Sequence, residues 1–413
     1  MQTRTFGKTG ETVSLRGFGC RRYPPKNGRN EEDRTERQVR SAIEAGVNYF
    51  DTAYLYSGSE AILGRILAKG LRDRVLIADK IPPFLVHARK DLDRLLGVLL
   101  ERLQTNRIDF LLVHALNDYE GWRRFRACGF DEWLAEVRAA GKVRHIGFSW
   151  HGSREDFIRV VDDFEWEFCQ IQYNYLDEQY QAGRDGMRHA AAKGLGVVIM
   201  EPLRGGMLTG RLPDVAREAM EKAPIRRTPA AWAFDWLYDQ PELQVVLSGM
   251  NEEAHIEENI RLASQASVGM LSPEEQAVIG TVRDALRSRI RVGCTGCGYC
   301  MPCPAGVNIP DVFAMYNAAA LEHSLQHRIQ YTMAGSGYAG GKPNHAGLCT
   351  QCGKCERHCP QHIAIRKELA DAHKTLRIRA ISPLIAGLRL YTRIRSKNTQ
   401  VTRGGRSGEV GQV

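Results

Sequence analysis

Eight cysteines near the C-terminus have the spacing needed to bind iron. The second group reads C-x2-C-x2-C-x3-C-P, the spacing of bacterial iron–sulfur ligation, and the first group reads C-x2-C-x2-C-x2-C-P. A chain that turns tightly around a cubane can supply three thiolates from one run, whereas the fourth ligand comes from elsewhere. The two groups are Cys294, Cys297, Cys300 and Cys303, and Cys349, Cys352, Cys355 and Cys359.

The two runs together resemble a dicluster ferredoxin domain. This resemblance implies that the last cysteine of each run binds the cluster of the other run. The first run is one residue short before Cys303, which leaves the reach of this cysteine open. A pair of tetrahedral zinc sites is the alternative, although zinc sites usually space their cysteine pairs more widely. The implied ligand sets for two [4Fe-4S] clusters are Cys294, Cys297, Cys300 and Cys359, and Cys303, Cys349, Cys352 and Cys355.

The composition indicates a large globular protein in a reducing compartment. The chain has 413 residues, 43% of them hydrophobic, and lacks an apolar stretch of about 18 residues that could span a membrane. The other cysteines, Cys20, Cys128 and Cys169, are scattered, and no secretory segment opens the chain, so we expect a cytoplasmic location.

The net charge of +9 is concentrated in a basic tail. We expect this tail to be partly disordered, with a short amphipathic helix over Pro383–Arg395 as one possibility. Weak contact with a membrane surface is the minor hypothesis for it, and no nucleic-acid partner is expected.

The first 265 residues alternate strand-like and helix-like patterns. Their rhythm and length predict an α/β fold, a (β/α)8 TIM barrel. An open doubly wound sheet is the alternative, but no G-x-G-x-x-G turn follows the first strand. The predicted strands are Ser14–Cys20, Asn48–Ala53, Arg74–Ile81, Asp109–Ala115, Arg144–Ser149, Cys169–Asn174, Gly196–Leu203 and Leu243–Met250. The predicted helices include Glu31–Ala45, Ser59–Ala68, Lys90–Leu103, Asp131–Ala140, Gly183–Lys193 and Pro229–Tyr238.

Four side chains with catalytic chemistry lie at or just after the ends of predicted strands, where a barrel places its active site. Asp51, Lys80 and His114 end the second, third and fourth strands, and Tyr56 follows in the loop after Asp51. Reduction of a carbonyl needs a proton at oxygen, and a tyrosine with a pKa of about 10 donates it poorly unless a nearby ammonium stabilises the phenolate. Asp51 would keep Lys80 charged, and His114 would orient the carbonyl oxygen.

This part of the chain resembles the aldo-keto reductase family. D-T-A-x-x-Y at Asp51–Tyr56, the strand-end Lys80 and I-D-x-x-x-x-H at Ile108–His114 match motifs of that family. The resemblance implies NAD(P)H-linked chemistry on a small carbonyl or alcohol substrate. The residues predicted to bind the cofactor are Ser149, Gln170, Met200, Glu201, Pro202, Leu203, Gly205, Ser248, Gly249, His255, Glu258 and Asn259.

Departures from the family pattern leave the choice between NADP and NAD open. Where the family holds the NADP 2′-phosphate with Lys and Arg, this chain has Gly249 and His255, with two glutamates nearby that would repel a phosphate. Met200–Glu201 replaces the segment that stacks on nicotinamide, and Trp150 with His151 marks a loop expected to affect substrate preference. A flavin stays open because a barrel can hold its phosphate, although no flavin fingerprint is present.

We therefore predict four segments: a barrel (1–265), a linker helix (266–290), a dicluster domain (291–372) and the tail (373–413). The linker helix has an N-cap at Ser272 with Glu275 three residues later, a capping box. Within the cluster domain, a helix over Ile309–Gln326 and a loop over Met333–Gly341 are expected. The predicted function is that of an iron–sulfur oxidoreductase with a redox partner protein; the alternative is a non-catalytic electron carrier or redox sensor with the barrel as scaffold.

Overall fold

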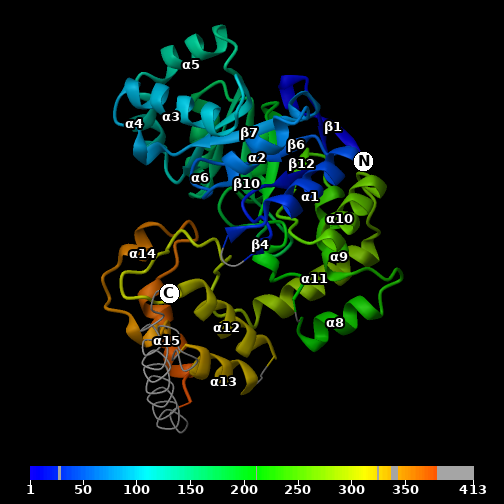
Figure 1. Cartoon of the computed structure of the whole chain (residues 1–413). Helices are drawn as coiled ribbons and strands as arrows, with labels where there is room; N and C mark the ends of the chain where they lie inside the picture. Colours follow the sequence, from blue (N-terminus) through cyan, green and yellow to red (C-terminus); the bar gives the residue numbers. More distant parts are fainter. Residues whose placement is uncertain (27–28, 211, 323–324, 336–342, 379–413) are drawn as a thin grey trace, which may run out of the picture. The chain divides into compact units, whose positions relative to one another are not determined.

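The computed structural model describes residues 1–26, 29–210, 212–322, 325–335 and 343–378, and these fall into two compact units (Figure 1). The first unit comprises residues 1–209 and 218–283, and the second comprises residues 210–217 and those from 284 onward. The predicted helix at Pro383–Arg395 lies outside the described residues. None of the helices in the described segments combines the length and apolar character needed to cross a lipid bilayer.

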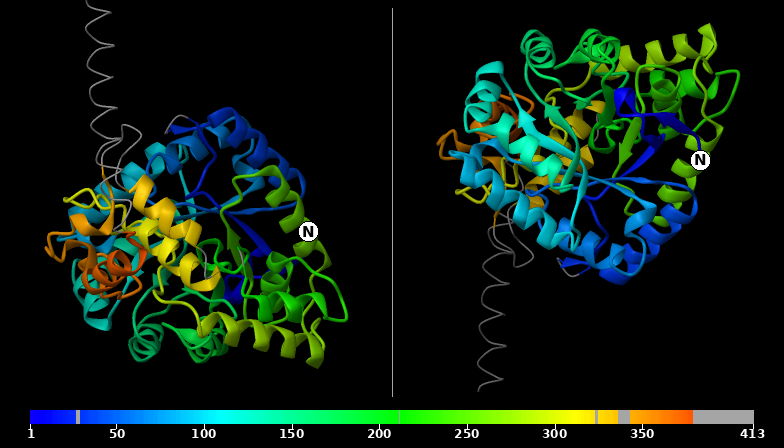
Figure 2. Two further views of the ribbon diagram at one scale, coloured as in Figure 1. Left: turned by 90° about the horizontal axis from the view of Figure 1, so that it is seen from below. Right: turned by 90° about the horizontal axis from the view of Figure 1, so that it is seen from above.

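The first unit is built around a closed barrel of eight parallel strands, which confirms the predicted fold. The strands follow one another around the barrel in chain order, and Figures 1 and 2 show helices surrounding them. Because both faces of these strands are covered, their sequences are nearly continuous apolar runs. The strands are β3 (Arg16–Gly19), β6 (Tyr49–Asp51), β7 (Leu76–Ile81), β8 (Ile108–Leu116), β9 (Val143–Trp150), β10 (Phe168–Gln172), β11 (Gly196–Met200) and β12 (Val245–Ser248).

The helices around the barrel turn an apolar stripe toward the strands. In α3, for example, the buried residues recur with the spacing of one helix face, at Leu92, Leu95, Leu96 and Leu99. The helices are α1 (Glu32–Glu44), α2 (Ser59–Leu67), α3 (Arg89–Arg102), α4 (Tyr119–Arg126), α5 (Phe130–Ala139), α6 (Arg154–Asp163), α7 (Gly183–Ala192), α9 (Pro229–Tyr238) and α10 (Glu253–Gln265). Two further helices, α8 (Asp214–Glu221) and α11 (Pro273–Arg287), contain residues of both units.

Four of these helices, α4, α6, α8 and α10, are not among the helices named in the sequence prediction. Two of them carry a capping signal that was available in the sequence. The Ser153 hydroxyl accepts a hydrogen bond from the Asp156 amide at the start of α6, and Asp118 accepts one from Gly121 at the start of α4.

An N-terminal hairpin, also absent from the prediction, fills one end of the barrel interior. Strands β1 (Thr3–Thr5) and β2 (Thr12–Ser14) pair antiparallel, and Phe6 follows β1. The Phe6 ring is fully buried, with ring-centroid distances of 5.9 Å to Tyr49, 5.0 Å to Phe110 and 5.5 Å to Phe168. A Cβ at Gly196 would lie 2.5 Å from this ring, so the position requires glycine. A second short hairpin pairs β4 (Pro25–Lys26) with β5 (Arg29–Asn30).

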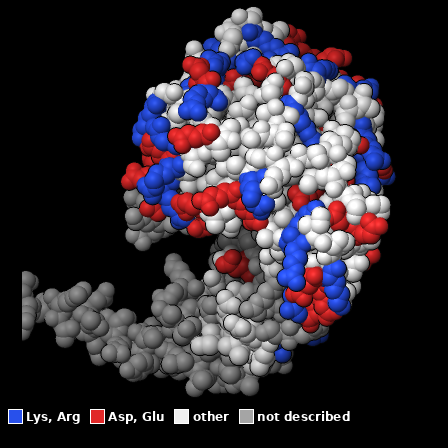
Figure 3. Space-filling view, turned by 90° about the vertical axis from the view of Figure 1, so that its right-hand side faces the viewer, with Lys and Arg blue, Asp and Glu red and all other residues white. Residues whose placement is uncertain are grey.

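Opposite charges are interspersed on the face that Figure 3 shows. Ion pairs tie neighbouring helices together: Arg65 of α2 lies 2.6 Å from Glu32 of α1, and Arg34 of α1 pairs with Glu252 and Glu253 at the start of α10. Each exposed pair contributes about 0–1 kcal/mol, so the buried apolar contacts dominate the stability of the barrel.

The capping box predicted for the linker helix is present at the start of α11. The Ser272 amide donates to the Glu275 carboxylate at 2.9 Å, and the Glu275 amide donates to the Ser272 hydroxyl at 3.3 Å. Arg227 adds a buried ion pair with Glu275 and another with Asp235 of α9. The helix is therefore anchored to the barrel unit at its N-terminus.

The second unit is helical in its described part. The described residues of the helix predicted over Ile309–Gln326 belong to α12, which is described to Glu322, and to α13, which is described from Leu325; residues 323–324 lie outside the described residues. The loop predicted from Met333 begins later, since α13 continues through Ala334, and residues 336–342 lie outside the described residues. The helices α12, α13 and α15 pack against one another (Figure 1). Their bounds, with that of the short α14, are α12 (Ile309–Glu322), α13 (Leu325–Ala334), α14 (Lys354–Arg357) and α15 (Ile365–Leu376).

Substitution of Phe6 tests the role of the hairpin. We expect Phe6→Ala to lower the free energy of unfolding of the barrel by about 3–5 kcal/mol, because the ring leaves a cavity among three aromatic rings. Phe84→Ala is the matched control, since Phe84 is 64% exposed. All six tryptophans lie between residues 122 and 236, so urea unfolding followed by tryptophan fluorescence reports on the barrel alone. Equal stability losses in the two variants would contradict the assignment.

Candidate functional site

Lys80 and Asp51 form a buried ion pair inside the barrel. The Lys80 Nζ donates hydrogen bonds of 2.6 Å to Asp51 Oδ1 and of 2.6 Å to the Thr52 carbonyl. The side chains of Lys80 and Asp51 are only 1% and 4% exposed. Burial raises the pKa of Asp51, and the attraction of the Lys80 ammonium opposes that rise. The Gln170 amide lies 3.4 Å from the second Asp51 oxygen and supports its orientation.

Tyr56 and His114 lie next to this ion pair. The Lys80 Nζ is 5.0 Å from the centroid of the Tyr56 ring. The Tyr56 and His114 rings meet edge to face, with centroids 5.9 Å apart and an interplanar angle of 83°. The structure thus brings together all four side chains predicted to be catalytic, around one point at the ends of β6, β7 and β8.

The strand that carries His114 differs from the prediction. It was predicted over Asp109–Ala115, whereas β8 spans Ile108–Leu116 with an irregular register between Val113 and Leu116. Ala115 has a φ of 52°, and its amide donates a 2.7 Å hydrogen bond to the Ser149 hydroxyl. Ser149, predicted to bind the cofactor, therefore also holds the irregular backbone beside His114.

His114 is buried and electrically neutral. Burial lowers its pKa well below the usual 6.5, and the positive charges of Lys80, His151 and Arg21 lower it further. A neutral imidazole donates one N–H hydrogen bond and does not carry the proton that a reduced carbonyl would need. This environment suits orientation of a carbonyl oxygen better than acid catalysis.

The sequence prediction did not include two arginines directly after β3. The Arg21 guanidinium carbon lies 5.5 Å from the centroid of the Tyr56 ring. The Arg22 side chain runs over Gly249, where an added Cβ would be 3.6 Å from the Arg22 Cβ. The available signal was a pair of consecutive basic residues immediately after a barrel strand, the edge at which active-site loops begin.

Five of the residues predicted to bind the cofactor lie together after β12. Ser248 ends the strand and accepts a 3.2 Å hydrogen bond from the Asn259 amide of α10. Glu258 accepts a 2.6 Å hydrogen bond from Thr228, the N-cap of α9, and His255 is exposed in the first turn of α10. Gly249 follows Ser248 in the loop that precedes α10.

The negative charge expected near Gly249 is compensated. Glu252 and Glu253 were expected to repel a phosphate, but both pair with Arg34 of α1. Hydrogen bonding to Arg34 lowers the pKa of Glu253 to about 2. The argument that these glutamates would repel the NADP phosphate therefore weakens. The sequence did not show the pairing, because Arg34 lies more than two hundred residues away from the glutamates in the chain.

The segment from Met200 to Gly205 forms a tightly held loop after β11. Glu201 has a φ of 53°, and its carbonyl accepts a 3.1 Å hydrogen bond from the Asn174 amide. Arg204 is buried, with its Nε 3.1 Å from Asp177 Oδ2, so its guanidinium orders the loop. Pro202 and Leu203 connect Glu201 to a short turn over Arg204–Gly206. Burial raises the pKa of the Glu201 carboxyl, whereas Arg22 and Arg21 oppose this rise.

The two residues expected to affect substrate preference have different positions. Trp150 is fully buried, packs against Phe148 and Phe157, and donates a 3.1 Å hydrogen bond to the Ser153 carbonyl, so it serves packing. His151 is also buried, and its electrostatic interaction with His114 contributes to the lowered pKa of His114, which places it at the edge of the catalytic group.

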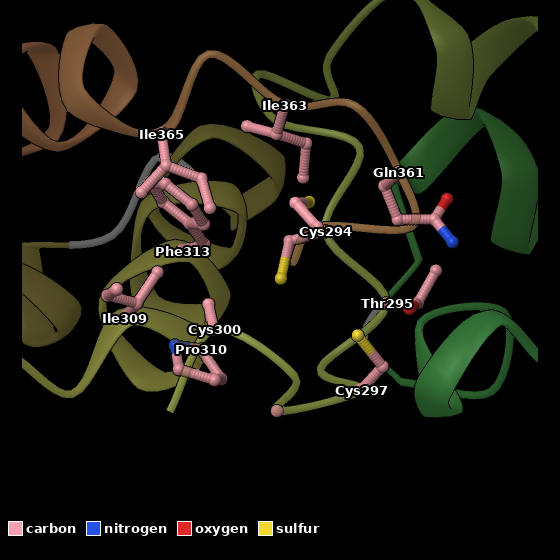
Figure 4. A pocket seen from close by; sticks show the side chains of 12 residues that line it. Cys294, Thr295, Cys297, Cys300, Ile309, Pro310, Phe313, Gln361, Ile363 and Ile365 are labelled. Atoms are coloured by element: carbon pink, nitrogen blue, oxygen red, sulfur yellow. The ribbon is translucent and has the colours of Figure 1, made fainter. Parts of the chain in front are cut away.

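In the second unit, cysteines from both runs line one pocket (Figure 4). Apolar side chains of α12 and of the segment that follows Cys359 complete its wall, including Phe313 and Ile365. The cysteines that line it are Cys294, Cys297, Cys300 and Cys359. This is the cross-run ligand set that the dicluster resemblance implies.

The donor chemistry of this pocket fits a group that carries positive charge. Burial and then the neighbouring cysteines Cys297, Cys294 and Cys359 raise the pKa of Cys300 to about 12. Such a thiol would stay protonated at neutral pH unless a cationic centre stabilised the thiolate. Gly296, with a φ of 68°, also aims its amide at the Cys294 sulfur, 3.4 Å away.

The second ligand set is less enclosed. Cys352 is exposed, whereas Cys303, Cys349 and Cys355 pack partly buried against the core of the unit. Burial raises the pKa of Cys355, and Glu356 and then Cys349 contribute in the same direction. In the described part of the chain, no group of three or more His, Cys, Asp or Glu side chains is arranged to hold a single metal ion.

The chain before the first cysteine is fixed by Asn317 of α12. Its Oδ1 accepts hydrogen bonds of 3.0 Å from the amides of Arg291 and Val292, and its Nδ2 donates one of 2.7 Å to the Val292 carbonyl. The side-chain amide thus replaces regular secondary structure and positions Cys294 two residues later.

Comparison with protein families identifies both units. The model of the aldo/keto reductase family matches residues 17–269, which is more than half of the chain. A model described as a 4Fe-4S dicluster domain matches residues 293–364. The barrel and the paired cysteine runs thus correspond to two separately defined families.

Individual relatives cover about two thirds of this chain. L-galactose dehydrogenase of Arabidopsis thaliana is 28% identical over 65% of this chain and 91% of its own length. The 6-dehydroglucose reductase of Novosphingobium aromaticivorans is 29% identical over 62% of this chain and 88% of its own length. A solved aldo-keto reductase from Bacillus halodurans, 22% identical, superimposes with a TM-score of 0.55 over 68% of this chain and 96% of its own, and shows that the fold is shared.

The neutral state of His114 predicts a pH dependence of stability. Folded His114 stays neutral far below pH 6.5, whereas the unfolded chain binds a proton there with a pKa of about 6.5. Its contribution to stability is therefore complete above that pH and is lost as the pH falls, with a slope approaching about 1.4 kcal/mol per pH unit. We expect His114→Gln to remove this slope from tryptophan-monitored urea unfolding.

All other titrating groups are common to the wild type and His114→Gln. The difference between their profiles of unfolding free energy against pH therefore isolates the contribution of His114. His87→Gln, at an exposed histidine, is the control and should leave the slope unchanged. Parallel profiles for the wild type and His114→Gln would show that His114 is not buried in a neutral state.

Proposed function

Because the chain belongs to the aldo/keto reductase family and carries a 4Fe-4S dicluster domain, we propose an iron–sulfur oxidoreductase whose barrel interconverts a small carbonyl compound and its alcohol. One observation carries the proposal: a Lys80 ammonium held by buried Asp51 lies beside the Tyr56 ring and the neutral His114. That combination supplies a proton donor and an orienting group at one point.

The four side chains act as a unit in the proposed reduction. Tyr56 gives its hydroxyl proton to the carbonyl oxygen, and the ammonium of Lys80 stabilises the phenolate left behind. Asp51 keeps that ammonium charged, and His114 donates a hydrogen bond that aligns the oxygen. NAD(P)H, when bound, would supply the hydride for the carbonyl carbon, so that carbonyl, NADH or NADPH and one proton would yield alcohol and the oxidised nucleotide.

The proposed site for the NAD(P)H cofactor extends from Gln170 and Met200 to Asn259. The Arg22 side chain lies over Gly249, the position at which the family has a lysine, so this arginine can replace the missing cation for a cofactor phosphate. Arg34 neutralises the two glutamates of the same region. Both features favour acceptance of NADPH as well as NADH. No described residue argues specifically for a flavin.

The second unit would hold two [4Fe-4S] clusters, with Cys294, Cys297, Cys300 and Cys359 as the ligands of the enclosed one. Clusters supply one-electron transfer when bound. Exposure of Cys352 marks the other ligand set as the side accessible to a partner protein, so we propose that external electrons enter or leave there.

The relatives suggest a substrate class for the barrel. One relative is a galactose dehydrogenase and another reduces a dehydroglucose, and both names describe chemistry on a sugar. We therefore propose a small hydroxylated carbonyl compound as substrate.

Removal of the Tyr56 hydroxyl tests the reductase mechanism. We expect Tyr56→Phe to lower kcat for NAD(P)H-dependent aldehyde reduction by about 10²–10⁴-fold, because the proton donor is lost. Affinity for the nucleotide, measured by its fluorescence, should be retained. The matched control is Tyr54→Phe, two residues earlier in the same loop, whose ring lies 4.6 Å below Arg102. Full turnover by Tyr56→Phe would exclude this mechanism, and a wild type without nucleotide binding would favour the electron-carrier alternative.

A cysteine substitution tests the cross-run ligation. We expect anaerobically purified wild type to contain about eight iron atoms and eight sulfides, and Cys359→Ser to lose about half of each, because its cluster loses a ligand. Cys128→Ser, at a cysteine of the barrel unit, should keep the wild-type content. The measurements are iron, acid-labile sulfide and zinc analysis with electron paramagnetic resonance of the reduced protein. Unchanged iron in Cys359→Ser, or zinc in place of iron, would contradict the assignment.

A further inference from the structure

We propose that Arg21 binds an anionic group of the substrate, so that the barrel prefers carbonyl compounds bearing a carboxylate or a phosphate. The inference rests on the proposed carbonyl reduction and adds the chemical class of its substrate. It starts from the position of Arg21 beside the proton donor, with its guanidinium carbon 5.5 Å from the Tyr56 ring centroid.

The backbone that presents Arg21 is fixed. Cys20, the preceding residue, is fully buried, and its amide donates a 2.8 Å hydrogen bond to the Asp51 carbonyl. The Cys20 carbonyl accepts a 2.8 Å hydrogen bond from the Ser59 hydroxyl. Tyr23 is again buried, so the half-buried Arg21 and the exposed Arg22 lie between two anchored residues. A group held this way binds with little loss of backbone freedom.

The charge around the catalytic group favours an anion. Arg21, Arg22 and Lys80 bring three positive charges to this end of the barrel. Of the nearby carboxylates, Asp51 is paired with Lys80, and burial raises the pKa of Glu201, which reduces its negative charge. The positive charge of Arg21 also contributes to the lowered pKa of His114, after burial and the charge of Lys80, so its field reaches the point where the carbonyl oxygen would lie. Carboxylates and phosphates are the groups that the planar guanidinium binds best.

In this proposal Arg21 binds the substrate, whereas Arg22 binds the cofactor. Arg21 faces Tyr56, whereas Arg22 lies over Gly249. A second role for Arg21, stabilising the Tyr56 phenolate together with Lys80, would affect all carbonyl substrates equally. Preference for anionic over neutral substrates therefore separates anion binding from general activation.

The experiment compares matched aldehydes in kcat/KM assays with NADPH. Succinic semialdehyde against butanal tests a carboxylate, and glyceraldehyde 3-phosphate against glyceraldehyde tests a phosphate. We expect wild type to prefer one anionic member, and Arg21→Met to reduce that preference by about 10- to 100-fold, as expected for loss of a charge-assisted hydrogen bond. Arg21→Lys should restore part of the preference. Arg22→Met should raise the KM for NADPH and leave the preference as in wild type.

An equal preference in wild type and Arg21→Met, or a wild type that favours both neutral members, overturns the inference. Absence of NADPH oxidation with every aldehyde defeats the proposed reductase function instead. In that case calorimetric titration with succinate and with inorganic phosphate decides the inference without turnover. Binding that weakens at least about tenfold in Arg21→Met supports it, and equal or undetectable binding in both proteins rejects it.

Discussion

The buried ion pair between Lys80 and Asp51 is the interaction on which the candidate active site depends. Two charges removed from water lose several kcal/mol of hydration each, and only close, correctly oriented contacts offset that loss. Here the ammonium meets Asp51 and the Thr52 carbonyl at 2.6 Å each. Both residues are contributed by β6 and β7, adjacent parallel strands of the closed barrel, so barrel closure itself sets the geometry. Tyr56 and His114 then take their electrostatic environment from this pair.

The cost of burying charge also governs the second unit, where the charged groups would be cysteine thiolates. Buried thiols stay protonated unless a cationic centre neutralises them, and the pocket gathers three cysteines of one run with Cys359 of the other. The contrast with exposed Cys352 gives the unit one enclosed and one accessible ligand set. The proposed function thus combines two-electron hydride chemistry in the barrel with one-electron transfer in the second unit. How electrons pass between such chemistries depends on which carrier or partner the protein uses.

Much of the architecture could be predicted from local sequence. All eight barrel strands were predicted because buried parallel strands are short apolar runs, and the linker capping box was predicted because its partners are three residues apart. The hairpin with Phe6 was not predicted, because its three-residue strands gain their stability from aromatic contacts with Tyr49, Phe110 and Phe168, far away in sequence. The helices α4 and α6 were missed although their caps at Asp118 and Ser153 are visible in the sequence.

The sequence by itself determined which residues have the chemistry: the cysteine spacing and the order of aspartate, tyrosine, lysine and histidine are properties of the chain. Only the tertiary structure decided the charge that these residues experience. In the folded chain Arg21 lies beside Tyr56, and Arg22 lies over Gly249. Arg34 pairs with Glu252 and Glu253, for which the sequence had indicated no partner. The physical reason is that motif spacing follows distance along the chain, whereas electrostatic interaction follows distance through space.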